Sequence, residues 1–180
     1  MAQGYEAGGH RGVFNTNAPD SNLGTIALTR LLARQLHIPV IAAGGIMDGA
    51  GIASALRLGA AAAQLGTAFV AASESAADEG YRALLASGAA HHTVMTAVIS
   101  GRPARCLPNL FTALGADVSA GEIPAYPATY DAGKALNAAA KVKGEPGYGA
   151  QWAGQGAPLA RTLPAAELMA TLIEELKAAA

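Results

Sequence analysis

The stretch that decides the fold is Pro39-Val-Ile-Ala-Ala-Gly-Gly-Ile46, which Gln64-Leu-Gly-Thr-Ala-Phe69 follows a short way along the chain. Each segment is an apolar run that leads directly into a turn of small residues. Strands of a parallel sheet covered on both faces have such near-continuous apolar sequences, because neither row of side chains faces water. The residues between the segments have the spacing of an amphipathic helix. The sequence therefore predicts a strand–helix–strand unit, with strands over 40–43 and 60–65 and a helix over 49–58.

The limits of the central helix follow from residues with strong local preferences. Asp48 precedes the helix and can accept hydrogen bonds from the free N–H groups of its first turn. Gly59 follows the helix and suits the left-handed conformation that commonly ends one. The side chains expected on the buried face are Ile52, Leu56 and Leu58.

The two turns have the composition of a phosphate-binding site. Gly44-Gly45 and Gly66-Thr67 leave backbone N–H groups uncovered at the ends of consecutive strands, and Thr67 adds a hydroxyl donor. Such a pair of turns is typical of the phosphate site after strands 7 and 8 of a (β/α)8 barrel. Gln64 could instead point into the barrel and contact a planar ring. Two ordinary strand–helix turns without a ligand are the alternative interpretation.

Outside this unit the pattern predicts mainly helices. The expected helices cover residues 25–36, 73–86, 107–114, 127–140 and 165–177, and β-branched residues predict a short strand over 93–99. Asp20 or Ser21 is expected to cap the first helix. Its expected buried face is Ile26, Leu28, Leu31, Leu32 and Leu36, and that of the last helix is Leu168, Leu172, Ile173 and Leu176.

The number of strands is too small for a closed barrel, which needs about eight. The chain is therefore either part of a larger protein or a small open α/β unit. Residues 3–10 resemble the end of a strand, which favours the first possibility. The fold class predicted is α/β, as the C-terminal part of a (β/α)8 barrel.

Composition excludes several classes of function. The chain has 180 residues, of which 52% are hydrophobic, and a net charge of -1, so nothing indicates binding to nucleic acid or an anionic membrane. No apolar run approaches the ~18 residues of a spanning helix. The N-terminus has no signal-peptide pattern, and we expect a cytoplasmic protein. The single cysteine, Cys106, excludes an internal disulfide and is expected to be a small, partly buried side chain. His91-His92 lacks the spacing and neighbours of a metal site.

His10 is the candidate for proton transfer. It stands in Glu6-Ala-Gly-Gly-His-Arg-Gly12, where the glycines let the chain turn sharply and leave the imidazole accessible. Histidine suits proton abstraction at neutral pH. Glu6 and Arg11 either orient His10 or are simply solvated. The alternative is a loop histidine that hydrogen-bonds to the backbone.

A second group of candidates lies near the C-terminus. Tyr126, Tyr130 and Lys134 are four residues apart, which places them on one face if a helix starts at or just after Tyr126. Two phenols and an ammonium could bind an anionic substrate, although an ordinary surface helix has the same pattern. Trp152 stands in a glycine-rich segment, where it either walls a pocket or packs in the core.

Together these segments resemble the nitronate monooxygenases, flavoenzymes formerly called 2-nitropropane dioxygenases. The string from Glu6 to Gly12 is the specific part of the resemblance, since many FMN-binding barrels share a pair of phosphate turns. The resemblance runs over nearly the whole chain and is carried by residues 4–12, 39–46, 64–69, 100–105, 126–134, 152–155 and 159–161.

The resemblance implies oxidation of propionate 3-nitronate and related alkyl nitronates with O2 to a carbonyl compound and nitrite. It implies a TIM-barrel FMN domain over 1–73, a mainly helical substrate domain over 74–145, and a C-terminal segment over 146–180 that returns to the barrel. His10 matches the catalytic histidine, acting as base toward a neutral nitroalkane or as partner of an anionic nitronate. The residues expected near non-covalent FMN are Gly44, Gly45, Gln64, Leu65, Gly66 and Thr67, and those near substrate are Tyr126, Tyr130 and Lys134.

Members of this family also have an N-terminal half, so we expect the chain to be part of a longer protein or a truncated product. The expected partners are a nitronate and O2, and formation of a homo-oligomer stays open. One alternative is an FMN-dependent NADH:quinone or enoyl reductase on the same barrel, which NADH consumption would reveal. The other is an inactive half-barrel with exposed sheet edges, prone to aggregate.

Overall fold

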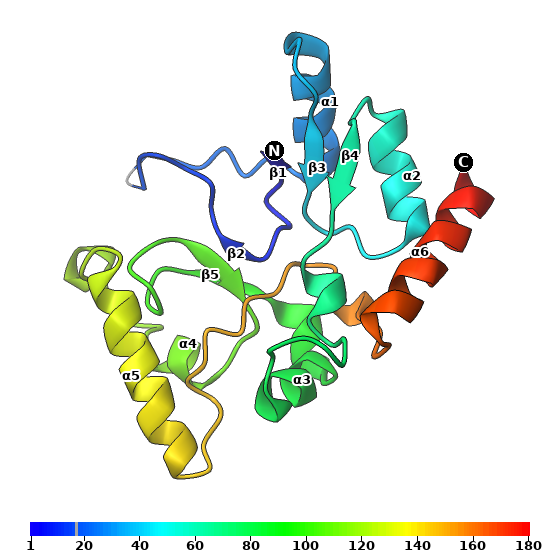
Figure 1. Cartoon of the computed structure of the whole chain (residues 1–180). Helices are drawn as coiled ribbons and strands as arrows, with labels where there is room; N and C mark the ends of the chain where they lie inside the picture. Colours follow the sequence, from blue (N-terminus) through cyan, green and yellow to red (C-terminus); the bar gives the residue numbers. More distant parts are fainter. Residues whose placement is uncertain (17) are drawn as a thin grey trace.

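The computed structural model describes residues 1–16 and 18–180, in which the strands form two small sheets (Figure 1). One sheet is parallel, with the order β1 (Ala2–Gln3), β3 (Ile41–Ala43) and β4 (Ala62–Gln64). The other is antiparallel, with the order β2 (Gly9–His10), β6 (Ala104–Cys106) and β5 (Val94–Thr96). The short segment from β1 to β2 therefore connects the two sheets.

The predicted strand–helix–strand unit is confirmed as β3, α2 (Gly49–Arg57) and β4, with β3 parallel to β4. Asp48 caps α2, since its Oδ1 accepts a hydrogen bond of 2.8 Å from the N–H of Gly51. Gly59 has φ +100° just after the helix, as predicted. Helix α1 (Thr25–Gln35) packs on β1 and β3, and α6 (Ala165–Ala179) packs along α2 (Figure 1).

The predicted cap of α1 is wrong. Gly24 occupies the cap position, and the first N–H of the helix, that of Thr25, donates instead to Oε2 of Glu6 at 2.7 Å. Asp20 is already engaged, because it pairs with Arg11 and accepts from the N–H of Asn22. A carboxylate from the β1–β2 segment therefore replaces the local cap.

The predicted buried faces of the helices are wrong in part. In α1 the buried side chains are Thr25 and Thr29, whereas Ile26 is 68% exposed. The threonine face lies on the sheet because Oγ1 of Thr25 donates to Glu6 at 2.7 Å and also lies within 3.0 Å of the Gly44 carbonyl. In α6, Leu168 and Leu172 are buried as predicted, but Ile173 is exposed.

Helix α2 buries small residues in place of Leu56, which is exposed. The reason is the close approach of α6, since a Cβ added to Gly49 would lie 2.2 Å from the backbone nitrogen of Leu176. Ala53 and Ala55 are the other buried residues of α2, while Ile52 packs beside the core of the sheet.

Helices α3 (Glu79–Leu85) and α4 (Leu110–Leu114) begin later than predicted, because each starts at a residue whose side chain caps it. Helix α3 follows Asp78, whose Oδ1 accepts from the N–H of Tyr81 at 2.8 Å. Helix α4 follows Asn109, which forms a capping box with Thr112. Helix α5 spans Ala128–Val142, and short 3-10 turns cover Thr67–Phe69, Gly88–His92, Ala120–Glu122 and Ala157–Leu159.

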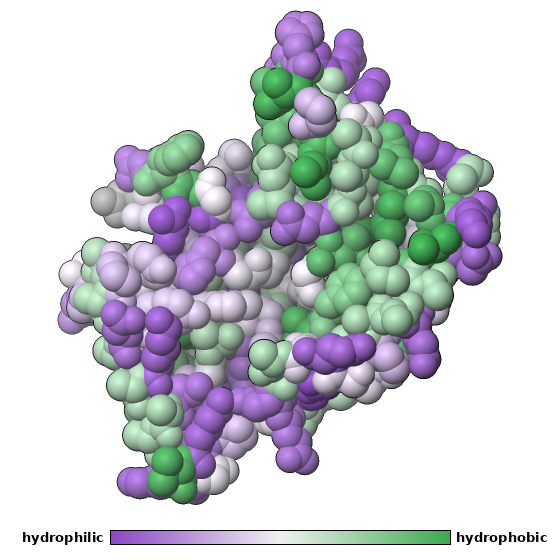
Figure 2. All heavy atoms as spheres, in the orientation of Figure 1, coloured by the Kyte–Doolittle hydropathy of each residue, from purple (hydrophilic) through white to green (hydrophobic). Residues whose placement is uncertain are grey.

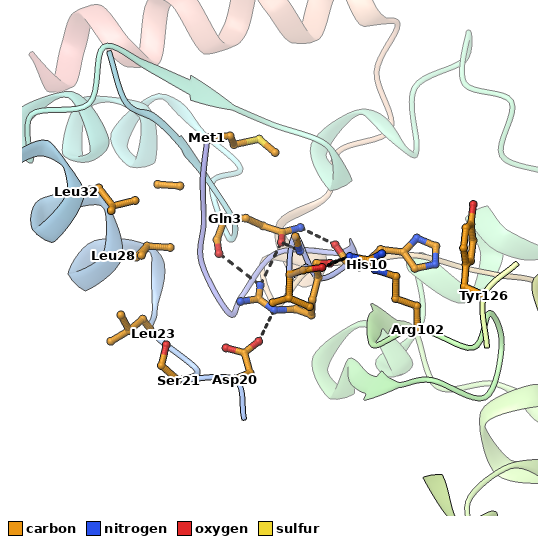
Figure 3. Close-up of a pocket in the computed structure, with 14 residues that line it drawn as sticks. Met1, Gln3, His10, Asp20, Ser21, Leu23, Leu28, Leu32, Arg102 and Tyr126 are labelled. Carbon is orange, nitrogen blue, oxygen red and sulfur yellow. Dashed lines mark hydrogen bonds and ion pairs between the residues drawn. The ribbon is translucent and has the colours of Figure 1, made fainter. Parts of the chain in front are cut away.

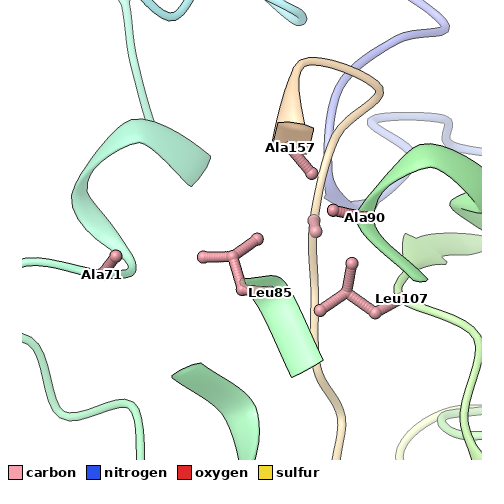
Figure 4. Packing of buried hydrophobic residues seen from close by; sticks show 6 residues of the cluster. Ala71, Leu85, Ala90, Leu107 and Ala157 are labelled. Atoms are coloured by element: carbon pink, nitrogen blue, oxygen red, sulfur yellow. The ribbon is translucent and has the colours of Figure 1, made fainter. Parts of the chain in front are cut away.

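A buried apolar cluster joins α3 to the C-terminal segment. Leu85, Leu107 and Ala157 belong to it, together with smaller side chains around them (Figure 4). Cys106 is fully buried nearby, and burial raises the pKa of its thiol to about 12, so the predicted packing role is confirmed. None of the described helices is both long and apolar enough to cross a bilayer.

Candidate functional site

His10 lies at the end of β2, which pairs with β6, and three aromatic side chains surround its ring. The ring centroids of Tyr126 and Tyr130 are each 5.7 Å from that of His10, and the centroid of Trp152 is 5.1 Å away. The tertiary structure thus brings together candidates that are more than a hundred residues apart in the sequence.

The imidazole of His10 has one hydrogen-bonding partner among the described residues. Its Nε2 lies 2.9 Å from Oγ of Ser100, which is fully buried. Burial first, and then the guanidinium charge of Arg102, lower the pKa of His10 below 6.5. The side chain is therefore neutral at pH 7 and can accept a proton.

Ser100 and Arg102 are site residues that sequence reasoning missed. Both stand in Ser100-Gly-Arg-Pro-Ala-Arg105, a string used only to support the family resemblance. The available signal was a hydroxyl and a guanidinium in one of the strings that carry the family resemblance. Their closeness to His10 depends on the pairing of β2 with β6.

Glu6 and Arg11 do not orient His10, contrary to one of the two expectations for them. Glu6 accepts from the N–H and hydroxyl of Thr25 at the start of α1. Arg11 is buried, pairs with Asp20 at 2.7 Å, and donates to the carbonyl of Gly4 at 2.8 Å. Both side chains hold the segment that carries His10 rather than the imidazole itself.

Lys134 lies next to Tyr130, one of the three aromatic residues around His10. Its Nζ lies 4.4 Å from the centroid of the Tyr130 ring and 3.2 Å from Oδ1 of Asp131. The side chain is exposed, and with Tyr130 and Gln151 it lines a cavity of about 370 Å³. Tyr126 precedes α5, so only Tyr130 and Lys134 of the predicted stripe lie on that helix.

Both phosphate-type turns line a second cavity of about 380 Å³. Gly9 and Trp152 also line this cavity. Gly9 precedes His10 in the sequence, and the ring of Trp152 lies against that of His10. The predicted cofactor residues that line it are Gly44, Gly45, Gln64, Gly66 and Thr67. Leu65 does not line the cavity, because its side chain packs on the apolar cluster of Ala42 and Ile46.

The residues of this cavity fit a phosphate group. A Cβ added to Gly66 would meet nothing within 4 Å, so the glycine leaves open space beside its backbone. Gly45 has φ +69°, a conformation that favours glycine, and neither its N–H nor that of Gly66 donates a hydrogen bond within the described residues. Oγ1 of Thr67 accepts from the N–H of Gly154 at 3.0 Å, which leaves its own proton free for an anion.

His10 also lines a wider cavity of about 760 Å³ (Figure 3). Gln3, Arg102 and Tyr126 line it near the imidazole, and Leu28 and Leu32 of α1 line its far wall. His10 lines this cavity but not the cavity of the phosphate-type turns, and Met1 and Gln3 line both.

The family model for nitronate monooxygenase matches residues 1–175. A protein named nitronate monooxygenase from Paraburkholderia phytofirmans is 68% identical over 98% of this chain and 48% of its own length. Another, from Pseudomonas aeruginosa, is 55% identical over 98% of this chain and 50% of its own length. The chain thus spans about half the length of the curated relatives it matches.

Solved structures agree with these relatives. Nitroalkane oxidase from Streptomyces ansochromogenes superposes with a TM-score of 0.90 and 40% identity, covering 98% of this chain and 51% of that one. FabK from Thermotoga maritima superposes with a TM-score of 0.75 and 31% identity, covering 98% of this chain and 53% of that one. With the family model matching almost from end to end, this chain belongs to the nitronate monooxygenase family.

Proposed function

We propose that the protein to which this chain belongs is an FMN-dependent nitronate monooxygenase, which oxidises alkyl nitronates of the propionate 3-nitronate type with O2. The products are a carbonyl compound and nitrite. The observation that carries the proposal is His10, which lies among three aromatic rings and beside a cavity built by two phosphate-type turns. Membership of the family supports the same reaction.

The proposed architecture is the C-terminal part of a (β/α)8 barrel. Residues 1–73 would supply its last strands, residues 74–145 a mainly helical substrate domain, and residues 146–180 the return to the barrel. The parallel sheet β1-β3-β4 supports the first assignment. Helix α5, which brings Tyr130 and Lys134 to the site, supports the second.

The proposed cofactor residues are Gly44, Gly45, Gln64, Gly66 and Thr67, with Leu65 contributing only through its backbone. Backbone N–H groups and the Thr67 hydroxyl would hold the phosphate of FMN. When bound, FMN supplies the redox chemistry, which none of the side chains at this site can perform.

The side chains have separate roles in this proposal. His10 takes the proton next to the nitro group of a neutral nitroalkane, or contacts the negative charge of a nitronate. Tyr126 and Tyr130 cover the reacting atoms, and the ammonium of Lys134 attracts the anion from solvent.

The visible absorption spectrum of the chain, after incubation with FMN and removal of free flavin, tests the cofactor site. We expect stoichiometric flavin on the chain and much less on Gly66→Leu, whose side chain would fill the cavity. Gly121→Leu is the matched control, since Gly121 also faces open space but lies outside the cavity. Equal flavin retention by all three proteins would contradict the assignment.

Oxygen consumption with propionate 3-nitronate, measured on the flavin-loaded protein, tests the reaction. We expect turnover with the nitronate and nitrite as a product, without any need for NADH. Consumption of NADH in the absence of a nitronate would instead support the reductase alternative.

A further inference from the structure

The hydroxyl of Ser100 has two neighbours and only one proton. Its oxygen lies 2.9 Å from Nε2 of His10 and 3.1 Å from the carbonyl oxygen of Arg102. Ser100 is fully buried, so water cannot complete its hydrogen bonds from outside. A carbonyl oxygen can only accept, whereas a neutral imidazole nitrogen either donates or accepts according to its tautomer.

Only one arrangement satisfies all three groups. If Ser100 donates to the Arg102 carbonyl, its oxygen accepts from an N–H on Nε2 of His10, and every donor has an acceptor. If Ser100 donated to Nε2, the Arg102 carbonyl would lose this donor and no N–H would reach the Ser100 oxygen. Buried polar groups left without partners are costly, which favours the first arrangement.

We propose that Ser100 is a positioning residue that holds His10 in the Nε2–H tautomer, so that Nδ1 is the nitrogen that accepts a proton. The role of His10 as a base rests on the proposed function, whereas its tautomer does not. Nδ1 makes no hydrogen bond to any of residues 1–16 and 18–180. It is therefore the ring nitrogen that remains free for substrate.

The loop that carries Ser100 packs against two neighbouring segments, which fixes the position of the hydroxyl beside His10. A Cβ added to Gly101 would lie 2.4 Å from the carbonyl oxygen of Pro124, so the two loops are in close contact. Arg102 donates to the carbonyls of Arg11 and Val13, which lie on the segment after β2. Ser100, His10 and the loop leading to Tyr126 thus form one packed unit.

The arrangement also accounts for every proton during abstraction. The C–H bond of a neutral nitroalkane breaks, its electron pair stays on the substrate as the nitronate, and the proton goes to Nδ1. The imidazolium keeps donating through Nε2–H to Ser100, and Ser100 keeps donating to Arg102. No second proton has to move. His10 and Ser100 therefore keep the same hydrogen bonds before and after the proton is taken.

Nuclear magnetic resonance of the flavin-loaded protein with 15N-labelled histidine tests the tautomer directly. His10→Gln identifies the His10 signals among those of the four histidines. We expect neutral His10 to carry its proton on Nε2, with slow exchange to water because the proton is hydrogen-bonded. A proton on Nδ1 in the neutral form would overturn the proposal, whether or not the enzyme turns over nitronates.

The pKa of His10 in Ser100→Ala gives a second test with opposite signs for the two arrangements. An accepting Ser100 stabilises the imidazolium, so its removal should lower the pKa of His10 by about one unit. A donating Ser100 stabilises the neutral ring, so its removal would raise that pKa and overturn the proposal. Arg102 is the charged group that shifts His10, and it is present in both proteins.

Ser54→Ala is the matched control. It removes a hydroxyl that donates only to the carbonyl of Ala50 on α2, and it should leave the His10 signals unchanged. If Ser100→Ala does not fold, the tautomer measurement on the unsubstituted protein decides alone. A shift of the His10 pKa by Ser54→Ala equal to that by Ser100→Ala would contradict a specific role of Ser100.

Discussion

His10 is kept neutral by its surroundings, and its chemistry follows from that. Burial and the nearby Arg102 charge disfavour the imidazolium, which places the pKa of His10 below 6.5. Activity that needs a base should therefore persist through neutral pH and fall only as the pH drops through this lowered pKa. The same surroundings place three aromatic rings around the imidazole.

Replacing His10 with asparagine separates its two possible roles. We expect His10→Asn to reduce kcat on a neutral nitroalkane about 100-fold or more, because general-base catalysis is lost. Turnover of a preformed nitronate, which needs no proton removal, should fall much less. Oxygen consumption by the flavin-loaded enzyme with both substrates gives the comparison. Equal losses on the two substrates would indicate a binding role alone.

In the proposed function, the side chain of Lys134 contributes to substrate binding through its positive charge. Its ammonium is exposed and already paired with Asp131, so its contribution should be modest. We expect Lys134→Met to raise KM for an anionic nitronate about 5-fold, or about 1 kcal/mol, with flavin retention unchanged. Lys177→Met is the control, since Lys177 is an exposed partner of Glu174 on α6. An unchanged KM would show that Lys134 is an ordinary surface residue with no part in substrate binding.

At the scale of elements, the contact between α2 and α6 depends on a residue without a side chain. Gly49→Ala would place a Cβ 2.2 Å from the backbone nitrogen of Leu176 and force the helices apart. We expect a loss of about 2 kcal/mol in the free energy of unfolding, measured by urea denaturation. Gly88→Ala, where a Cβ meets nothing within 4 Å, should have a much smaller effect. Similar losses in both variants would show that the close approach is unimportant.

A second interaction between α2 and α6 depends on pH. Glu175 of α6 accepts from Arg161 at 2.5 Å and from the N–H of Gly49 at 2.9 Å. The Arg161 hydrogen bond, more than the others, lowers the pKa of Glu175 below 4.5. Since the folded pKa is the lower one, the stabilisation is present above the unfolded pKa and disappears as the pH falls through the folded value.

We therefore expect Glu175→Gln to have a lower Tm than the unsubstituted chain at neutral pH. The difference should shrink as the pH falls below 4.5, because protonation then makes Glu175 of the unsubstituted chain neutral, as the glutamine already is. Glu167→Gln, which changes an exposed carboxylate on the same helix, is the control for Tm curves measured by circular dichroism. A difference in Tm that does not depend on pH would contradict the linkage.

At the scale of the whole molecule, the parallel sheet has open edges. Neither β1 nor β4 has a second strand partner within the described residues. Apolar side chains lie exposed beside this sheet, and Figure 2 shows apolar surface over α1 and α2. Open edges next to apolar surface are typical of surfaces that associate with another polypeptide.

We expect the isolated chain to associate as its concentration rises, as measured by sedimentation velocity. Ile26→Lys should reduce this association, because Ile26 is 68% exposed on α1 and a charge there opposes contact. Val142→Lys, at an exposed position at the end of α5, should leave it unchanged. A monomer at all concentrations would indicate that the exposed surface does not drive association.

Local sequence determined the parts of this protein that depend on near neighbours. The strand–helix–strand unit, the Asp48 cap and the Gly59 stop could be predicted because a few adjacent residues set each of them. The candidate turns and His10 were likewise predicted from sequence, because glycine-rich strings after strands and a histidine among glycines are local patterns.

Tertiary structure alone decided which side chains meet. The threonine face of α1, the capping of that helix by Glu6 and the placing of Ser100 against His10 each join segments that are distant in the chain. Periodicity identifies an apolar stripe but contains no information about which neighbour covers it. The partner of a polar group depends on how strands and loops pack, and that depends on the whole fold.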